Sequence, residues 1–255
     1  MYAYIHSIET MGAVDGPGLR YVIFTSGCPL RCKYCHNPDT WNKLDGRKVT
    51  VDELIKDYLN YKPFLKNGGI TVSGGEPLLQ IDFLIELFTK AKKLNIHTCL
   101  DTSGATFDIN DDEKMEKFKK LTAVTDLVLL DIKHIDPLEY KELTGGNLSQ
   151  TLNFLDFLSK KETYCDVWIR HVVVKDITYI GKYLYRLGYH IGIYDNIKAL
   201  EVLPYHDMAV NKYKKLNITY PLEGMPAMTK EQAQKAKKYI EAGIVDRRLN
   251  NPPAF

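Results

Sequence analysis

Two hydrophobic patterns alternate along most of the chain. Short runs rich in apolar and β-branched residues are each followed by a longer stretch with apolar residues at helical spacing. This alternation is typical of strand-then-helix units. Six such units follow one another, and their expected strands cover residues 20–27, 68–77, 97–104, 125–134, 166–175 and 199–206.

The expected helices carry recognisable boundary residues. Thr50 and Glu53 form a capping-box pattern at the start of the first helix. Thr229 is a suitable N-cap for the last helix, and Gly243 is expected to end it. A Gly145–Gly146 pair interrupts the fourth helix. The expected helices cover residues 49–65, 81–95, 111–122, 137–161, 177–191 and 229–243.

The order of these units predicts the fold class. Strict strand–helix alternation favours an α/β fold with a parallel sheet inside and helices outside. Right-handed crossovers would curl six units into a partial (β/α)6 barrel, two units short of a complete barrel. A doubly wound open sheet is the competing architecture. The 255 residues fit one domain, 1–255, with a core from about residue 18 to 245 and short extensions at both ends.

Composition narrows the function classes. Hydrophobic residues make up 45% and charged residues 26% of the chain, and the net charge is only +2, which does not favour a nucleic-acid or membrane-surface protein. We see neither a signal-peptide pattern nor an apolar run long enough to span a membrane, so we expect a cytosolic protein. Because disulfides are rare in the cytosol, we expect the five cysteines to be metal ligands or buried thiols. Cys99 and Cys165, which lie among apolar strand residues, read as buried thiols.

Polar groups gather where the expected strands end. Barrels and open α/β sheets both carry their sites at the C-terminal edge of the strands. We therefore expect the site at this edge. The polar groups are the cysteine loop after the first strand, Gly74–Glu76, Asp101–Gly104, Asp131–Lys133 and Pro204–His206.

The cysteine loop holds Cys28, Cys32 and Cys35 in C-x3-C-x2-C spacing. Structural zinc sites normally use four ligands from two cysteine pairs, and here no second pair exists, while His36 is awkwardly adjacent. Simple buried thiols do not suit the charged surroundings of the loop. Thiolates also hold cubane iron–sulfur clusters, usually four per cluster. Three cysteines would leave one iron open to a substrate or cofactor.

Two motifs carry a resemblance to a known superfamily. C-x3-C-x2-C with Tyr34 before the last cysteine resembles the signature of the radical S-adenosylmethionine (radical SAM) superfamily. The "GGEP" of Gly74–Pro77 resembles the GGE motif of that superfamily. A further resemblance is to the activating enzymes of glycyl-radical enzymes, in particular those that act on pyruvate formate-lyase. It is carried by the blocks "VDGPGLR", "CKYCHNPDTW", "TVSGGEPLLQ", "HTCLDTSG", "LVLLDIK", "VWIRHVVV" and "LPYH". Residues 37–73 contain no cysteine, which implies a single cluster, and the segment after His206 is less distinctive.

The resemblance implies a fold, cofactors and a reaction. It implies a partial barrel of the radical SAM type that binds a 4Fe-4S cluster and S-adenosyl-L-methionine. The expected reaction is reductive cleavage of S-adenosylmethionine and hydrogen-atom abstraction from a backbone glycine of pyruvate formate-lyase. Flavodoxin or ferredoxin is the implied electron donor, and a monomer the implied state. The alternatives are an activase of another glycyl-radical enzyme, a radical SAM enzyme acting on a small molecule, and a non-enzymatic zinc or iron–sulfur module.

The resemblance also assigns roles in the cysteine loop. Cys28, Cys32 and Cys35 would ligate the cluster. Tyr34 and His36 flank the last ligand and are expected to contact the adenine.

A second group of residues would hold the methionine part of the cofactor. Gly74 and Gly75 would let the backbone approach it closely. Glu76 would accept a hydrogen bond from the methionine ammonium. Asp131 and Lys133 alternate on the fourth strand and would form a charged pair, with Lys133 neutralising the methionine carboxylate.

A third group completes the expected site. Asp101, Thr102 and Asp131 would hold a monovalent cation beside the methionine carboxylate. His206 would lie near the ribose. Arg170 interrupts an apolar strand and needs a partner, either the ligand or Asp101.

Two further features belong to this expectation. Ile132, between Asp131 and Lys133, falls in the cofactor-binding stretch. Asp15, Gly16 and Gly18 fit a tight turn, and in the family this region helps to receive the glycine loop of the partner.

Overall fold

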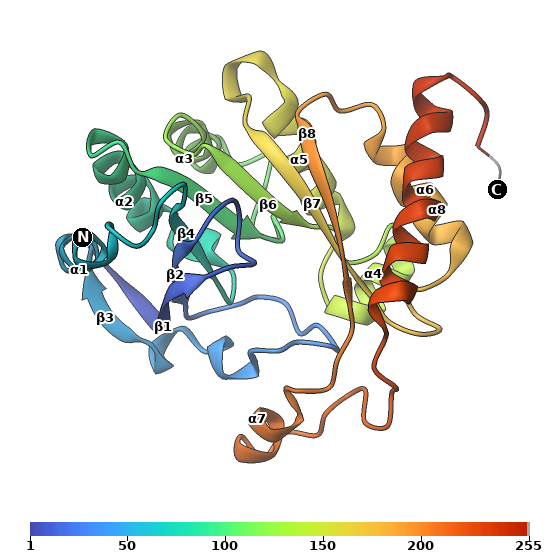
Figure 1. The fold of residues 1–255 in the computed structure, drawn as a ribbon, viewed down its shortest axis with the longest axis horizontal. Helices are drawn as coiled ribbons and strands as arrows, with labels where there is room; N and C mark the ends of the chain where they lie inside the picture. The colour runs from blue at the N-terminus through green and yellow to red at the C-terminus, as the bar shows by residue number, and fades with distance from the viewer. Residues whose placement is uncertain (254–255) are drawn as a thin grey trace.

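The computed structural model describes residues 1–253, which form one eight-stranded sheet in the order β3-β1-β2-β4-β5-β6-β7-β8 (Figure 1). The six strands from β2 to β8 in this order are parallel, and β1 and β3 join them antiparallel at one edge. The strands are β1 (Tyr2–Gly12), β2 (Arg20–Thr25), β3 (Arg47–Thr50), β4 (Gly69–Gly74), β5 (His97–Thr102), β6 (Leu127–Asp131), β7 (Asp166–Val173) and β8 (Ile197–Pro204).

Helices follow the parallel strands and cover the outside of the sheet (Figure 1). The α-helices are α1 (Val51–Tyr61), α2 (Ile81–Lys93), α3 (Asp112–Thr122), α4 (Pro137–Thr144), α5 (Leu148–Ser159), α6 (Gly181–Ile191), α7 (Val210–Lys215) and α8 (Lys230–Arg248). Short 3-10 helices are η1 (Pro38–Thr40), η2 (Lys43–Asp45), η3 (Pro77–Gln80) and η4 (Lys161–Thr163).

The predicted partial barrel is confirmed. All six expected parallel strands are present, and the sheet is open because β3 and β8 are its two ends. The single domain over residues 1–255 stays a prediction, and its last two residues lie outside the described range.

Two strands of the sheet, β1 and β3, were not predicted from the sequence. β1 is eleven residues long, but its register shifts between Ile5 and Ser7 and again between Glu9 and Gly12, which disturbs the period-two pattern of a strand. β3 has only four residues, and its last two, Val49 and Thr50, fall within the expected first helix. Its exposed Arg47 and Lys48 suit an edge strand, where charge discourages pairing with other chains.

The helix boundaries are partly as predicted. The Thr50 hydroxyl accepts a hydrogen bond from the Glu53 amide, and the Glu53 carboxylate accepts one from the Thr50 amide, so the capping box is confirmed. Thr229 caps α8 in the same way with Gln232. Gly145, in the left-handed region at φ 73°, ends α4.

The prediction that Gly243 ends the last helix is wrong, because α8 continues to Arg248. A Cβ atom on Gly243 would lie 2.2 Å from the Tyr185 carbonyl oxygen of α6. Likewise, a Cβ atom on Gly188 of α6 would lie 1.8 Å from the Ile240 carbonyl oxygen of α8. Both glycines therefore mark a close crossing of α6 and α8.

Hydrogen bonds anchor the loop between β1 and β2 to β4. Arg20, fully buried, donates to the Ile70 carbonyl (2.7 Å) and to the Thr71 hydroxyl (2.9 Å). The Thr71 hydroxyl in turn donates to the Asp15 carbonyl at 2.6 Å. The chain bends here, and Gly16 and Gly18 have positive φ values of 118° and 70°, which suit the glycines expected in this loop. These contacts hold Asp15 under the cavity described below.

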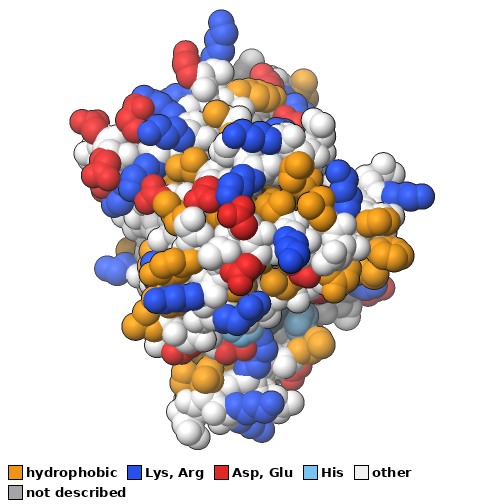
Figure 2. Space-filling view, turned by 90° about the vertical axis from the view of Figure 1, so that its left-hand side faces the viewer, with side chains coloured by type: hydrophobic (Ala, Val, Ile, Leu, Met, Phe, Trp, Pro, Cys, Tyr) orange, Lys and Arg blue, Asp and Glu red, His pale blue; other side chains and the backbone are white. Residues whose placement is uncertain are grey.

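On the face that carries α1 and β3, acidic and basic side chains lie interspersed with small apolar areas (Figure 2). This face therefore agrees with the small net charge of the chain. Among residues 1–253, none of the helices combines the length and apolarity that crossing a bilayer requires.

Candidate active site

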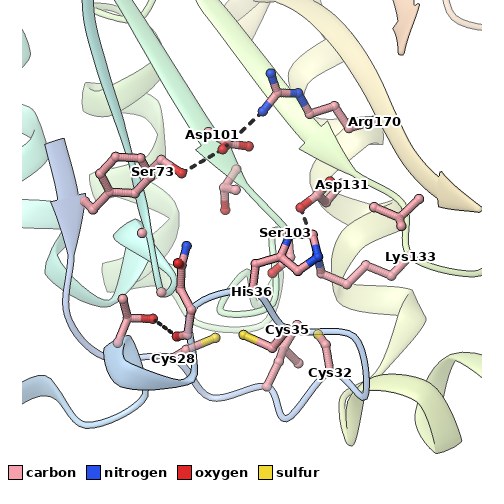
Figure 3. A pocket seen from close by; sticks show the side chains of 18 of the residues that line it. Cys28, Cys32, Cys35, His36, Ser73, Asp101, Ser103, Asp131, Lys133 and Arg170 are labelled. Atoms are coloured by element: carbon pink, nitrogen blue, oxygen red, sulfur yellow. Dashed lines mark hydrogen bonds and ion pairs between the residues drawn. The ribbon is translucent and has the colours of Figure 1, made fainter. Parts of the chain in front are cut away.

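A cavity of about 270 Å³ opens at the C-terminal ends of the parallel strands (Figure 3). Its walls come from the loop after β2 and from the ends of β4, β5, β6 and β7. The sequence-predicted site residues that line it are Cys28, Cys32, Tyr34, Cys35, His36, Gly74, Gly75, Asp101, Thr102, Asp131, Lys133 and Arg170. Glu76, Ile132 and His206 lie behind this lining, and Asp15 joins it.

The three cysteines lie together on one side of the cavity. The sulfur atoms of Cys28 and Cys35 face each other, and Cys32 lies beside Cys35 (Figure 3). Backbone hydrogen bonds hold the loop: the Cys28 amide donates to the Trp41 carbonyl (3.2 Å) and the Cys35 amide to the Cys32 carbonyl (3.0 Å). All three are free thiols.

Burial keeps these thiols protonated. It raises the pKa of Cys28 to about 12 and that of Cys32 to about 11. The pKa of Cys35 is also raised by burial, although an Asn37 backbone group and the Trp41 indole stabilise its thiolate by hydrogen bonding. Metal binding at this loop must therefore displace protons.

The donor set suits a cluster better than a single ion. Within residues 1–253, no three or more His, Cys, Asp or Glu side chains converge on a position for one metal ion. In a cubane, by contrast, each thiolate binds a separate iron, so the sulfur atoms do not have to meet at one point. Three thiolates on one wall of a cavity fit that demand.

The glycine turn after β4 is docked on the cysteine loop. The Gly75 amide donates to the Thr25 carbonyl (2.9 Å), and the Glu76 amide donates to the Gly27 carbonyl (2.8 Å). A Cβ atom on Gly75 would stand 2.2 Å from the Gly27 carbonyl oxygen, so a side chain has no room there. Gly74 needs its φ of 120° for the same turn.

Glu76 lies outside the cavity lining and binds the last residue of β5 and the residue that follows it. Its carboxylate, 1% exposed, accepts hydrogen bonds from the Thr102 hydroxyl and from both the amide and the hydroxyl of Ser103. These bonds tie the glycine turn to the end of β5.

Two basic side chains on the opposite wall of the cavity are held in ion pairs (Figure 3). Lys133 pairs with Asp131 at 2.8 Å, which confirms the charged pair expected from their alternation. Arg170 pairs with Asp101 at 3.3 Å and with Glu201 at 2.7 Å.

The pKa values in this wall reflect burial and pairing. Burial raises the pKa of Asp101 above its usual range, although Arg170 opposes this. Burial alone would lower the pKa of Lys133, but Asp131 and other neighbours hold it well above its usual value. Lys133 is therefore a permanent cation facing the cavity.

His36 and His206 form a stack beside the cavity. Their ring centroids are 4.0 Å apart, and the Nε2 atom of His36 lies 3.2 Å from the His206 carbonyl oxygen. Nδ1 of His206 and the hydroxyl of Tyr34 are buried without a hydrogen-bond partner among the described residues. Two unsatisfied polar atoms beside a cavity suit a polar ligand that supplies their partners.

The structure adds to this site residues that the sequence did not single out, among them Ser73, Trp41 and Glu201. Ser73 lines the cavity and donates to Asp101 at 2.7 Å, and Trp41 lines it beside the cysteines. Glu201 is the second partner of Arg170, and the register of β7 and β8 places the two residues opposite each other. An acidic residue in the sixth expected strand was the available signal.

The fold and this site define a class of protein. The family description "Radical SAM superfamily" matches residues 22–181. The chain belongs to the Radical SAM superfamily. Within it, the chain is 47% identical to the "Pyruvate formate-lyase-activating enzyme" of Staphylococcus aureus (strain USA300) over 241 residues, covering 93% of this chain and 94% of the relative. The resemblance drawn from the motifs is therefore confirmed.

Solved structures share the fold. A domain of pyruvate-formate lyase-activating enzyme from Bacteroides vulgatus aligns with a TM-score of 0.55 and 20% identity, covering 69% of this chain and 94% of that one. Streptococcus suis SuiB bound to S-adenosylmethionine aligns with a TM-score of 0.60 and 18% identity, covering 89% of this chain and 47% of that one. At these identities the likeness concerns the fold alone.

Proposed function

We propose that this protein activates pyruvate formate-lyase by generating a glycyl radical on it, with a 4Fe-4S cluster and S-adenosylmethionine as cofactors. The observation that carries the proposal is the three-cysteine wall of a cavity in a chain 47% identical to an enzyme with this name. When bound, the cofactors supply a one-electron reductive cleavage whose product removes a hydrogen atom from a backbone glycine. The protein positions the reactants and excludes water.

The cysteine wall would hold three of the four irons. Cys28, Cys32 and Cys35 are the only thiols that line the cavity in the described part of the chain, since Cys99 and Cys165 are buried elsewhere, as expected. The fourth iron would remain open for the amine and carboxylate of S-adenosylmethionine. The two unsatisfied polar atoms, on Tyr34 and His206, support the expectation that the nucleoside part lies on their side.

The charged wall would hold the methionine part. Lys133 is a permanent cation suited to the methionine carboxylate. For Glu76 to accept from the methionine ammonium, its carboxylate must exchange a hydrogen bond to Thr102 or Ser103 for the ligand. The monovalent cation expected at Asp101, Thr102 and Asp131 would likewise compete with the present ion pairs of the two carboxylates.

The partner's glycine would reach the cavity past the loop between β1 and β2. Val14 of this loop is 75% exposed, and its carbonyl accepts a hydrogen bond from Arg170, while Asp15 lines the cavity. A glycine suits such a path because no side chain hinders close approach.

The electron donor is expected to be flavodoxin or ferredoxin, and the protein a monomer in the cytosol. Lys212 of α7 donates to Asn37 and pairs with Asp39 in the segment that follows Cys35, and α7 also carries Lys214 and Lys215. A cationic segment near the cluster favours an acidic carrier.

A glycyl-radical assay tests the proposal. Anaerobically reconstituted protein, S-adenosylmethionine and reductant are mixed with pyruvate formate-lyase, and with a variant of that partner whose target glycine is replaced by alanine. We expect the electron paramagnetic resonance doublet of a glycyl radical with the first partner only. Cleavage of S-adenosylmethionine without that doublet would contradict the proposal and favour another substrate, and a colourless protein with zinc and no iron would favour a non-enzymatic module.

A further inference from the structure

His171 lies beside the charged wall but faces away from the cavity. It follows Arg170 on β7, and since successive side chains of a strand alternate, Arg170 and Val172 line the cavity while His171 points to the other face. Its side chain is 3% exposed, and Nδ1 lies 2.7 Å from the Ile132 carbonyl oxygen.

We propose that His171 is a positioning residue for S-adenosylmethionine, because it fixes the Ile132 peptide and thereby directs Asp131 and Lys133 into the cavity. This inference rests on the proposed function only in that Lys133 binds the methionine carboxylate. It assigns His171 no contact with the cofactor.

Two hydrogen bonds hold the backbone of Ile132 to β7, one at its N–H and one at its C=O. The Ile132 amide donates to the Arg170 carbonyl at 3.0 Å, as the next rung of the β6–β7 ladder. The Ile132 carbonyl then receives its hydrogen bond from the imidazole of His171. In a continuing strand, a backbone N–H would donate this hydrogen bond. Here a side chain donates it, so the side chains after Asp131 keep alternating in direction although β6 has ended.

That alternation sets the direction of the two charged side chains. The Ile132 side chain is fully buried on the helix-covered side. Its neighbours Asp131 and Lys133 therefore both turn to the cavity, where they form their 2.8 Å ion pair. Rotation of the Ile132 peptide would move Lys133 away from the methionine carboxylate.

The chemistry of His171 suits a fixed donor. A carbonyl oxygen can only accept, so Nδ1 must carry the hydrogen. Nε2 is buried and has no hydrogen-bond partner within geometric limits in the described chain, although the Thr178 backbone favours the protonated ring. Burial lowers the pKa of His171 to about 4, and the nearby His134 acts in the same direction. His171 therefore remains a neutral donor near neutral pH.

Four variants test the inference in cluster-loaded protein. Asn presents an amide N–H close to the Nδ1 position, whereas Gln places its amide one bond further out, and Leu has no donor. His171→Asn, His171→Gln and His171→Leu are compared with His190→Leu. His190 is a second histidine with an unpartnered Nε2, located on α6 outside the site.

The main measurement is the dissociation constant of S-adenosylmethionine. It is obtained from the change that S-adenosylmethionine causes in the electron paramagnetic resonance spectrum of the reduced cluster. We expect His171→Leu and His171→Gln to weaken binding by about 10–100-fold, as loss of supporting shells does at metal sites. His171→Asn should stay within about threefold of the original, and His190→Leu should leave binding unchanged. Iron content and the kcat at saturating S-adenosylmethionine should stay near the original values.

Two outcomes would overturn the inference. One is unchanged binding in both His171→Leu and His171→Gln. The other is His171→Asn binding as weakly as His171→Leu, which would indicate a packing role alone. If His171→Leu does not fold, the comparison of His171→Asn with His171→Gln decides. Normal binding in the original protein without a glycyl radical would contradict the proposed partner and leave this inference standing.

Discussion

Gly75 packs against Gly27, and a Cβ atom on Gly75 would stand 2.2 Å from the Gly27 carbonyl oxygen. This contact joins the glycine turn after β4 to the residue that precedes Cys28. Two backbone hydrogen bonds from Gly75 and Glu76 run alongside it. The part of the site expected to bind methionine and the part expected to bind the cluster are therefore one packed unit.

The first prediction follows from that contact. Gly75→Ala must displace the turn from the cysteine loop, since the methyl group meets backbone. We expect a protein with lower iron and sulfide content, or with S-adenosylmethionine affinity reduced about tenfold, a loss of about 1.4 kcal/mol. Gly181→Ala is the control, because its Cβ atom would lie 3.4 Å from the Tyr239 ring, an ordinary contact distance. Original iron content and affinity in Gly75→Ala would contradict this reading.

The second prediction concerns the cluster ligands. Cys32→Ala removes one thiol of the cavity wall, so the cubane should not assemble, while circular dichroism should report an intact fold because the sheet does not depend on the loop. Cys165→Ala is the matched control, a buried cysteine far from the cavity. It should retain the cluster and lose about 1 kcal/mol of stability. A complete cubane in Cys32→Ala would show that the ligand assignment is wrong.

The third prediction concerns the reduction potential. The Trp41 indole stabilises the Cys35 thiolate by a hydrogen bond, and hydrogen bonds to sulfur ligands favour the reduced cluster. Trp41→Phe should therefore lower the potential, by on the order of tens of millivolts, in a redox titration monitored by electron paramagnetic resonance. Tyr213→Phe is the control, since it keeps the ring that packs edge-on against Trp41 and removes an unpartnered hydroxyl. An unchanged potential in Trp41→Phe would refute the role of this hydrogen bond.

The fourth prediction is a pH dependence of stability. The pKa of His171 is lowered by burial to about 4, so the unfolded chain takes up its proton first as the pH falls. The stability from His171 is complete above about pH 6.5, the usual histidine value, and is lost as the pH falls toward 4. Between pH 7.5 and 5.0 the loss should be about 2 kcal/mol.

Urea unfolding of cluster-free protein at both pH values measures this difference. In His171→Asn the change in unfolding free energy between pH 7.5 and 5.0 should be smaller by about 2 kcal/mol. Burial also lowers the pKa values of His36, His97, His134 and His190, which act in the same direction. Burial raises the pKa of Asp101 to about 6, so this carboxyl acts in the opposite direction, and both proteins should keep the same residual slope from these groups. Equal slopes in the original protein and in His171→Asn would contradict the prediction.

Local patterns in the sequence were sufficient for the six parallel strands and most helices. These patterns act within a single element, so they can be recognised from the sequence alone. They are the hydrophobic periodicity, the capping box at Thr50 and the glycine at position 145. β1 could not be predicted in this way, because its bulges disturb the alternation of apolar and polar residues. The role of Gly243 was predicted wrongly, because this glycine is needed for the close approach of another helix, α6.

The same contrast between local patterns and contacts across elements applies to the site. The motifs placed the cysteines, the glycine turn and the Asp131–Lys133 pair at one edge of the sheet, and left the partner of Arg170 open. They could not reveal that Glu76 turns toward Ser103, that Arg170 has Glu201 as a second partner, or that His171 binds the Ile132 carbonyl. Each of these contacts joins different strands or loops, so it depends on register and packing, which no local pattern encodes.

Mössbauer spectroscopy of the protein loaded with ⁵⁷Fe under anaerobic conditions tests most directly whether three cysteines leave one iron free. On addition of S-adenosylmethionine, we expect the signal of one iron out of four to change toward a higher coordination number while the other three stay as they were. Four irons that are already fully ligated by the protein, with no change on addition, would contradict the account.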